Sequence, residues 1–214
     1  MQKIAPHLWF DKEAREAAEF YVSVLPNSKI TNVTTLYDTP SGDCDVVSFE
    51  LSGQPFMAIS AGPLFKFNPS ISFHVKCRTK YEVDAMWKKL SKGGTVLMEL
   101  GSYPFSERYG WVQDKYGLSW QVIYVGESDI KQKITPLLMF VGGVCGKADE
   151  AVNFYASVFR NGRADILARY GKGEEPDKAG TVKYAAFTLE GQEFGAMDSA
   201  RAHPFTFNEA ILSW

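Results

Sequence analysis

Hydrophobic and polar residues alternate along residues 4–10, which is the pattern of a β-strand with one buried face. Its two faces carry Pro6, Leu8, Phe10 and Ala5, His7, Trp9. Small and apolar residues then recur at spacings of three and four from Ala14 to Val22, which predicts a helix with Asp11 as its N-cap. Three further strands are expected near residues 29–37, 45–52 and 55–60. The pattern therefore predicts a β-α-β-β-β module.

The same order of elements follows once more. A strand is expected over 70–77, a helix over 80–91, and strands near 95–99, 109–114 and 118–125. Asp114 and Gly117 are typical of a tight turn between the last two strands, where a carboxylate caps the turn and glycine adopts a positive φ. We expect the two modules of residues 1–127 to curve around a shared cleft, lined by strands 4–10 and 118–125.

Residues 134–212 repeat much of this sequence. Three blocks recur in order: IAPHLWF as ITPLLMF, FELSGQPFMAIS as FTLEGQEFGAMD, and PLFKFNPSIS as HPFTFNEAIL. Such a repeat points to duplicated structure. We therefore predict two α+β domains: a complete two-module domain over 1–127, and an incomplete copy over 134–214 that holds one module and the start of the next.

Charge and composition exclude several classes of partner. The 214 residues carry a formal net charge of −2 and show no basic run, which argues against nucleic acid. No apolar stretch reaches the roughly 18 residues that span a bilayer, and no signal peptide is recognised. The 3 cysteines are far apart and form no CxxC pair, which favours reduced thiols and a cytoplasmic protein.

Several longer motifs resemble a known family. They are I-x-P-x-L-x-F, F-E-L-x-G-Q-x-F-M-A, F-K-F-N-P-S-I-S-F and W-V-Q-D-K-Y-G-L-S-W-Q-V. Together they resemble the PhnB-like family of the vicinal-oxygen-chelate superfamily, which includes glyoxalases, bleomycin-resistance proteins and dioxygenases. The resemblance implies paired βαβββ modules that form a curved mixed sheet around a cleft, here as a tandem repeat with an incomplete second copy.

Many family members are described as 3-demethylubiquinone-9 3-methyltransferases. A methyltransferase needs a glycine-rich turn after its first strand, so that the backbone can approach the cofactor. The first strand here is followed by Asp11-Lys12-Glu13, without glycine. The residues therefore give no support to methyl transfer.

The resemblance also implies positions for metal ligands on inward-facing strand residues. These positions hold Ala5, Ser70, an apolar residue near Met57 to Ile59, and Gln121. Only Gln121 can ligate, and an amide oxygen is a weak ligand, so no metal or other cofactor is expected. A displaced divalent metal site formed by His7, His74 and Gln121 remains the alternative.

The candidate ligand-binding residues are the polar and aromatic side chains expected on the inner strand faces. They are His7, Trp9, Ser72, His74 and Gln121. We expect them to bind a small hydrophobic or aromatic molecule in a metal-poor cleft. Two alternatives stay open: a metal-dependent lyase, transferase or dioxygenase that uses the displaced site, and a non-catalytic structural remnant. Catalytic residues, and whether the chain is an enzyme at all, are left undecided.

The incomplete copy also predicts an assembly. A lone module over 134–212 would leave a sheet edge and an apolar face open, and an open edge invites pairing with another chain. We therefore expect a homodimer in which residues 134–212 form most of the interface.

Overall fold

The structure is a computed structural model that describes residues 4–213. The chain divides into two compact units: the first holds residues 1–67, 75–134 and 208–214, and the second holds 68–74 and 135–207. These units cut across the two sequence repeats, because short segments of each repeat lie in the unit of the other. Trp214, the last residue of the predicted second domain, lies outside the described residues.

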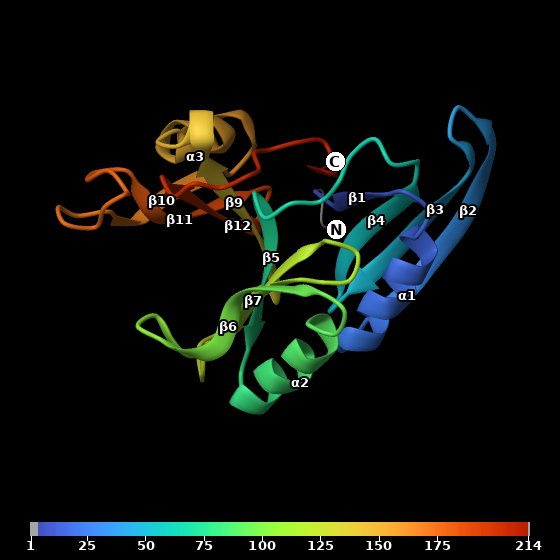
Figure 1. Cartoon of the computed structure of the whole chain (residues 1–214), viewed down its shortest axis with the longest axis horizontal. Helices are drawn as coiled ribbons and strands as arrows, with labels where there is room; N and C mark the ends of the chain where they lie inside the picture. Colours follow the sequence, from blue (N-terminus) through green and yellow to red (C-terminus); the bar gives the residue numbers. More distant parts are fainter. Residues whose placement is uncertain (1–3, 214) are drawn as a thin grey trace. The chain divides into compact units, whose positions relative to one another are not determined.

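A five-stranded mixed sheet forms one part of the first unit (Figure 1). Its order is β13-β1-β4-β3-β2, with β13 at Ile211–Ser213, β1 at Pro6–Phe10, β4 at Gln54–Ser60, β3 at Gly42–Leu51 and β2 at Lys29–Thr39. β1 runs parallel to β4, and the other neighbours are antiparallel. The three strands predicted after the first helix are confirmed within a few residues.

Helix α1 (Ala14–Val24) packs on one face of this sheet, mainly against β3. Its buried residues recur at helical spacing, and Tyr21 is fully buried among them. The prediction of Asp11 as N-cap is wrong: the N-cap is Glu13, and the hydroxyl of Ser60 on β4 accepts the hydrogen bond from the Ala14 amide. A side chain distant in sequence has taken the place of a local cap.

The second module of the first unit follows the predicted order. Helix α2 (Lys80–Leu90) begins after Thr79, whose hydroxyl accepts a hydrogen bond from the Glu82 amide at 3.1 Å. Strands β6 (Thr95–Tyr103), β7 (Ser106–Gln113) and β8 (Ser119–Tyr124) form an antiparallel meander. The turn between β7 and β8 confirms the role predicted for Asp114 and Gly117, because Gly117 has a φ of 86°.

The two modules of the first unit meet through their helix-bearing sides. Tyr21 on α1 packs against Trp120 on β8 with ring centroids 5.2 Å apart. β1 and β8 belong to different sheets, since β1 is paired on both sides by β13 and β4. β8 therefore does not pair with β1, and the shared cleft lined by strands 4–10 and 118–125 stays a prediction. The edge of β1 is filled instead by a strand of the second repeat.

The second unit is a module of the same kind. It contains β9 (Ile134–Val141), a short 3-10 turn at Gly142–Val144, α3 (Ala148–Val158), β10 (Arg163–Arg169), β11 (Val182–Leu189) and β12 (Gln192–Ser199). Its strand order is β10-β11-β12-β9, and the first residues of β5 (Ile71–Cys77) continue the sheet beside β9. β9 therefore has a partner on both sides within this unit.

Candidate functional site

The inner face of β7 and β8 carries two side-chain hydrogen bonds. The Tyr109 hydroxyl donates to Oε1 of Gln121 at 2.7 Å, and the Trp111 indole N–H donates to the Ser119 hydroxyl at 2.8 Å. Gln121 is only 7% exposed. Burial, with a smaller contribution from Tyr103, raises the pKa of Tyr109 well above its ordinary value. Tyr109 therefore remains a hydrogen-bond donor at neutral pH and fixes the orientation of the Gln121 amide.

An aromatic group borders the same face. Tyr103 stacks on Phe105 at 5.6 Å, and Phe105 meets the edge of Tyr109 at 5.0 Å. Phe105 is nevertheless 61% exposed. A cavity of about 590 Å³ lies here, lined by Tyr103, Pro104, Phe105, Ser106, Glu107, Ile123, Tyr124, Val125, Gly126 and Ser128. An exposed ring held in place by two tyrosines offers a flat apolar surface to a small molecule.

His7 and Trp9 lie together on one face of β1, as expected from their spacing. His7 sits between Met57 on β4 and Leu212 on β13, and its partial burial lowers its imidazole pKa. Trp9 donates its indole N–H to the Gly62 carbonyl at 2.7 Å and meets Phe65 edge to face at 5.1 Å. The polar atom of Trp9 thus holds the chain after β4.

Trp9 also lines a small cavity. This cavity has a volume of about 330 Å³, and its walls include Phe10, Phe65, Phe67 and Tyr116. Phe67 is 9% exposed and packs against Phe10. The space therefore lies between packed aromatic rings, with the charged residues Asp11, Glu13 and Lys66 also in its lining.

The remaining predicted residues lie on β5. Ser72 is 1% exposed, and His74 lies two residues further on the same face. Both belong to the segment 68–74 of the second unit, whereas His7, Trp9 and Gln121 belong to the first. Within the first unit, His7 and Gln121 lie on strands of different sheets. The displaced metal site thus stays a prediction.

The residues at the ligand positions that the family resemblance implies are poor ligands for a divalent metal. Within residues 4–213, no three His, Cys, Asp or Glu side chains gather in a way that could hold a metal ion. Ser70, at one implied ligand position, is 2% exposed, and its backbone carbonyl accepts a hydrogen bond from Met139. The amide oxygen of Gln121 already accepts the Tyr109 hydroxyl.

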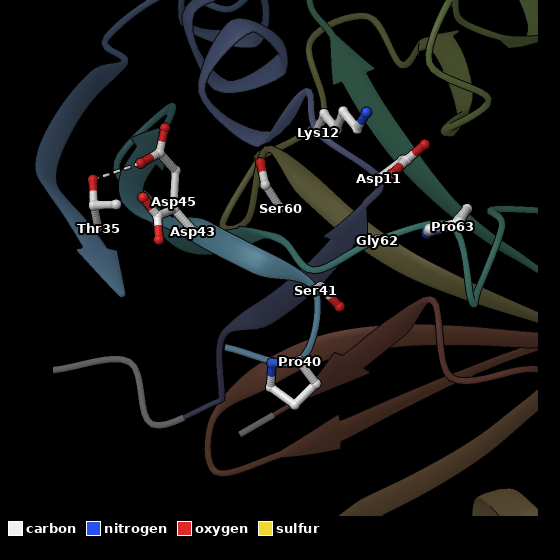
Figure 2. Close-up of a pocket in the computed structure, with 10 residues that line it drawn as sticks. All are labelled: Asp11, Lys12, Thr35, Pro40, Ser41, Asp43, Asp45, Ser60, Gly62 and Pro63. Carbon is white, nitrogen blue, oxygen red and sulfur yellow. Dashed lines mark hydrogen bonds between the residues drawn. The ribbon is translucent and has the colours of Figure 1, made fainter. Parts of the chain in front are cut away.

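A larger cavity of about 630 Å³ was not foreseen from the sequence (Figure 2). It is lined by Asp11, Lys12, Thr35, Pro40, Ser41, Asp43, Asp45, Ser60, Gly62 and Pro63. Some of its polar groups hold one another: Thr35 donates to Asp45 at 2.7 Å, and Asp43 accepts the Asp38 amide at 3.3 Å. These contacts hold the β2–β3 hairpin, so we interpret the lining as structural.

Comparisons with known proteins agree with the fold. A family model described as 3-demethylubiquinone-9 3-methyltransferase matches residues 2–123 and 132–213. The chain belongs to this family. A PhnB protein from Bacillus cereus with the same description is 40% identical over 58% of this chain and 100% of its own length, with a TM-score of 0.54. No curated protein matches the chain.

Two more distant structures share the fold alone. Protein PA1353 from Pseudomonas aeruginosa is 23% identical over 59% of this chain and all of its own, with a TM-score of 0.52. Glyoxalase I from Zea mays is 13% identical over 92% of this chain and 69% of its own, with a TM-score of 0.54. The fold that the resemblance implies is thereby confirmed.

The description of the PhnB-like family names methyl transfer, so the glycine-bearing turns matter. Only the second repeat has such a turn between its first strand and its helix, at Gly142–Gly146. There the buried carboxylate of Asp198 accepts the amides of Gly146 at 2.7 Å and Ala148 at 3.2 Å. A carboxylate already occupies the helix N-terminus where a cofactor's anionic group would bind. The sequence did not reveal this role, although Asp198 aligns with the capping residue Ser60.

Proposed function

We propose that this PhnB-like protein binds a small hydrophobic or aromatic molecule in the cavity between the β6–β7 turn and the end of β8. The observation that carries the proposal is the cavity beside Phe105, whose ring is 61% exposed while Tyr103 and Tyr109 hold it from two sides. An aromatic ligand that stacks on Phe105 would bury apolar surface that water now covers.

The polar groups beside this surface supply orientation rather than catalysis. The Tyr109–Gln121 and Trp111–Ser119 pairs satisfy one another, so binding leaves no buried donor without an acceptor. This arrangement suits a ligand with few polar atoms, and it contains no activated nucleophile.

Fluorescence titration with 8-anilinonaphthalene-1-sulfonate tests the site. We expect saturable binding, and Phe105→Ala should weaken it by roughly threefold to tenfold, since a ring–ring contact contributes about 0.5–1.5 kcal/mol. Tyr81→Ala is the matched control, because Tyr81 is an aromatic residue on α2 with 81% exposure. Equal effects of the two variants, or no saturation, would refute the proposal; the second result would favour a purely structural role.

A metal-dependent lyase, transferase or dioxygenase that uses His7, His74 and Gln121 is the second candidate. One observation favours it: burial lowers the pKa of His7, and the neutral imidazole is the form that binds metals. Calorimetric titration with zinc, nickel and manganese distinguishes the two. Stoichiometric metal binding that His7→Ala abolishes would establish the metal-dependent function. Under our proposal, we expect no stoichiometric metal binding.

Location and assembly remain proposals as well. No helix within residues 4–213 is long and apolar enough to cross a membrane, and Cys44, Cys77 and Cys145 are free. Free cysteines support a cytoplasmic protein. The net charge of −2 argues against nucleic acid. The homodimer was predicted partly from an open sheet edge within residues 134–212. The edge of β9 no longer supports it, because β5 pairs with β9. The homodimer therefore stays a prediction.

A further inference from the structure

Helix α3 presents large apolar side chains to solvent. Phe154 and Val158 are 62% and 60% exposed, and Tyr155 and Phe159 are each 37% exposed. They recur at spacings of one, three and four residues and so lie on one side of the helix and its C-terminal end. Together with Glu150 we call these residues the α3 face. A cluster of exposed apolar side chains often marks an interaction surface, whereas single exposed apolar residues are common on any protein surface.

The first repeat shows the same face in a covered state. Residues 14–25 align with 148–159 without a gap, so Glu16, Phe20, Tyr21, Val24 and Leu25 correspond to Glu150, Phe154, Tyr155, Val158 and Phe159. In the first repeat, Tyr21 is 0%, Leu25 is 3% and Val24 is 8% exposed. The second repeat retains apolar and acidic residues at these positions. The two repeats differ in whether other residues cover these side chains.

The cover of the α1 residues includes the β7–β8 hairpin of the second module. Tyr116 meets Phe20 at 5.9 Å and Tyr21 at 6.1 Å, and Trp120 meets Tyr21 at 5.2 Å. The hairpin therefore seats two aromatic rings on the helix. Its fixed turn, held by Asp114 beneath Tyr116, presents these rings as a rigid unit.

A charged contact accompanies the rings. Glu16 accepts hydrogen bonds from Nζ of Lys115 at 2.8 Å and from the Tyr116 hydroxyl at 2.6 Å. Its counterpart Glu150 contacts Lys147 of its own helix, three residues away. The second repeat has thus kept both the apolar and the acidic part of a surface that, in the first repeat, receives a Lys-Tyr hairpin.

We propose that the α3 face is a docking surface for a βαβββ module of the kind formed by residues 71–124, supplied by a partner polypeptide whose closing hairpin carries a lysine and a tyrosine. The lysine and the tyrosine bind Glu150, and the aromatic rings cover Phe154, Tyr155 and Val158. A second copy of this chain is not the occupant, because its 113–120 hairpin already covers its own α1.

The repeat itself suggests a direct test in the full chain. Residues 203–213 align with 63–73, the segment that leads into the covering module in the first repeat. Appending a second copy of residues 75–127 after Trp214 continues that alignment. Hydrogen–deuterium exchange then reports the α3 face through peptides that cover 148–159. We expect exchange there to slow by about tenfold or more, since contact with another module suppresses local opening.

Two variants of the extended chain make the test specific. Phe154→Glu should abolish the added protection. Leu167→Glu should leave it intact, because Leu167 is 58% exposed on β10 and its counterpart Val33 stays 37% exposed in the first repeat. Unchanged exchange in 148–159 would overturn the proposal. So would an appended segment that stays unprotected, since the same sequence folds against α1.

Light scattering on the unextended chain addresses the competing occupant. We expect a species that does not associate through α3, so Phe154→Glu should leave its mass unchanged. A dimer that Phe154→Glu dissociates would show that a second copy covers the face and would overturn the proposed partner.

Discussion

Removing the Asp114 carboxylate should strongly destabilise the first unit. Asp114 is 3% exposed and accepts hydrogen bonds from the Tyr116 amide at 2.8 Å, the Leu118 amide at 3.1 Å and the Trp120 indole at 2.8 Å. Leu118 and Trp120 are fully buried, so water cannot replace the lost acceptor without a cavity.

The magnitude follows from the donors left behind. Each buried donor without a partner costs about 1–3 kcal/mol. Relief of the cost of burying a carboxylate offsets part of this sum. We therefore expect Asp114→Ala to lower the free energy of unfolding by about 3–5 kcal/mol. Asp114→Asn keeps one acceptor oxygen and should cost about 1–3 kcal/mol.

Urea unfolding followed by tryptophan fluorescence measures the effect where it occurs. Four of the five tryptophans, Trp9, Trp87, Trp111 and Trp120, lie in the first unit, so most of the signal reports that unit. Asp84→Asn is the matched control. Asp84 lies on α2 and forms an exposed ion pair with Arg108, so it should contribute far less to stability. A cost of Asp114→Ala no larger than that of the control would refute the reasoning.

The pH dependence gives an independent check of sign. Desolvation raises the pKa of Asp114 against the opposing hydrogen bonds, so the folded state holds this proton more tightly than the unfolded state. The contribution of Asp114 to stability is then greatest below its unfolded pKa and falls as pH rises through the folded value. Asp114→Asn removes that gain, so its cost should be larger near pH 4 than at pH 7. The opposite trend would mean that the hydrogen bonds outweigh desolvation.

Two further changes test close packing and a cap. A Cβ at Gly110 would lie 2.4 Å from the Trp87 ring, so Gly110→Ala should cost about 1–3 kcal/mol, whereas Gly101→Ala, with its nearest atom at 3.7 Å, should be nearly neutral in thermal unfolding. Asp198→Ala removes the acceptor for Gly146, Ala148 and Val182 and should cost about 2–4 kcal/mol by urea unfolding followed by circular dichroism. Asp198→Ser, which installs the residue found at Ser60, should recover part of that loss; no recovery would contradict the capping role.

The sequence predicted the modules well because their signals are local. Alternation and helical spacing over about ten residues placed every helix and strand of 1–127. The hairpin role of Asp114 followed from turn chemistry alone. By contrast, the N-cap of α1 comes from Ser60, 46 residues away, so no local pattern could supply it.

The candidate site was harder to predict for the same reason. Gln121 was singled out for its position, but its partner Tyr109 became apparent only when β7 and β8 were paired. The spacing of His7 and Trp9 correctly placed them on one face. Nothing in that spacing revealed that Trp9 hydrogen-bonds to Gly62, since a strand pattern gives a side chain's face and not its partner.

Which modules pair is a question that the repeat makes ambiguous. The first strands of the modules resemble one another, so the edge of β1 can accept a strand from either repeat with similar hydrogen bonds. The local sequence pattern cannot show which strand pairing is more stable, because the pairings differ in which surfaces they leave exposed to solvent. Pairing β1 with β13 and β9 with β5 fills both first-strand edges within 214 residues. The surface left uncovered is then on α3 and not at a sheet edge. On a helix, side chains rather than backbone groups determine which partner can bind.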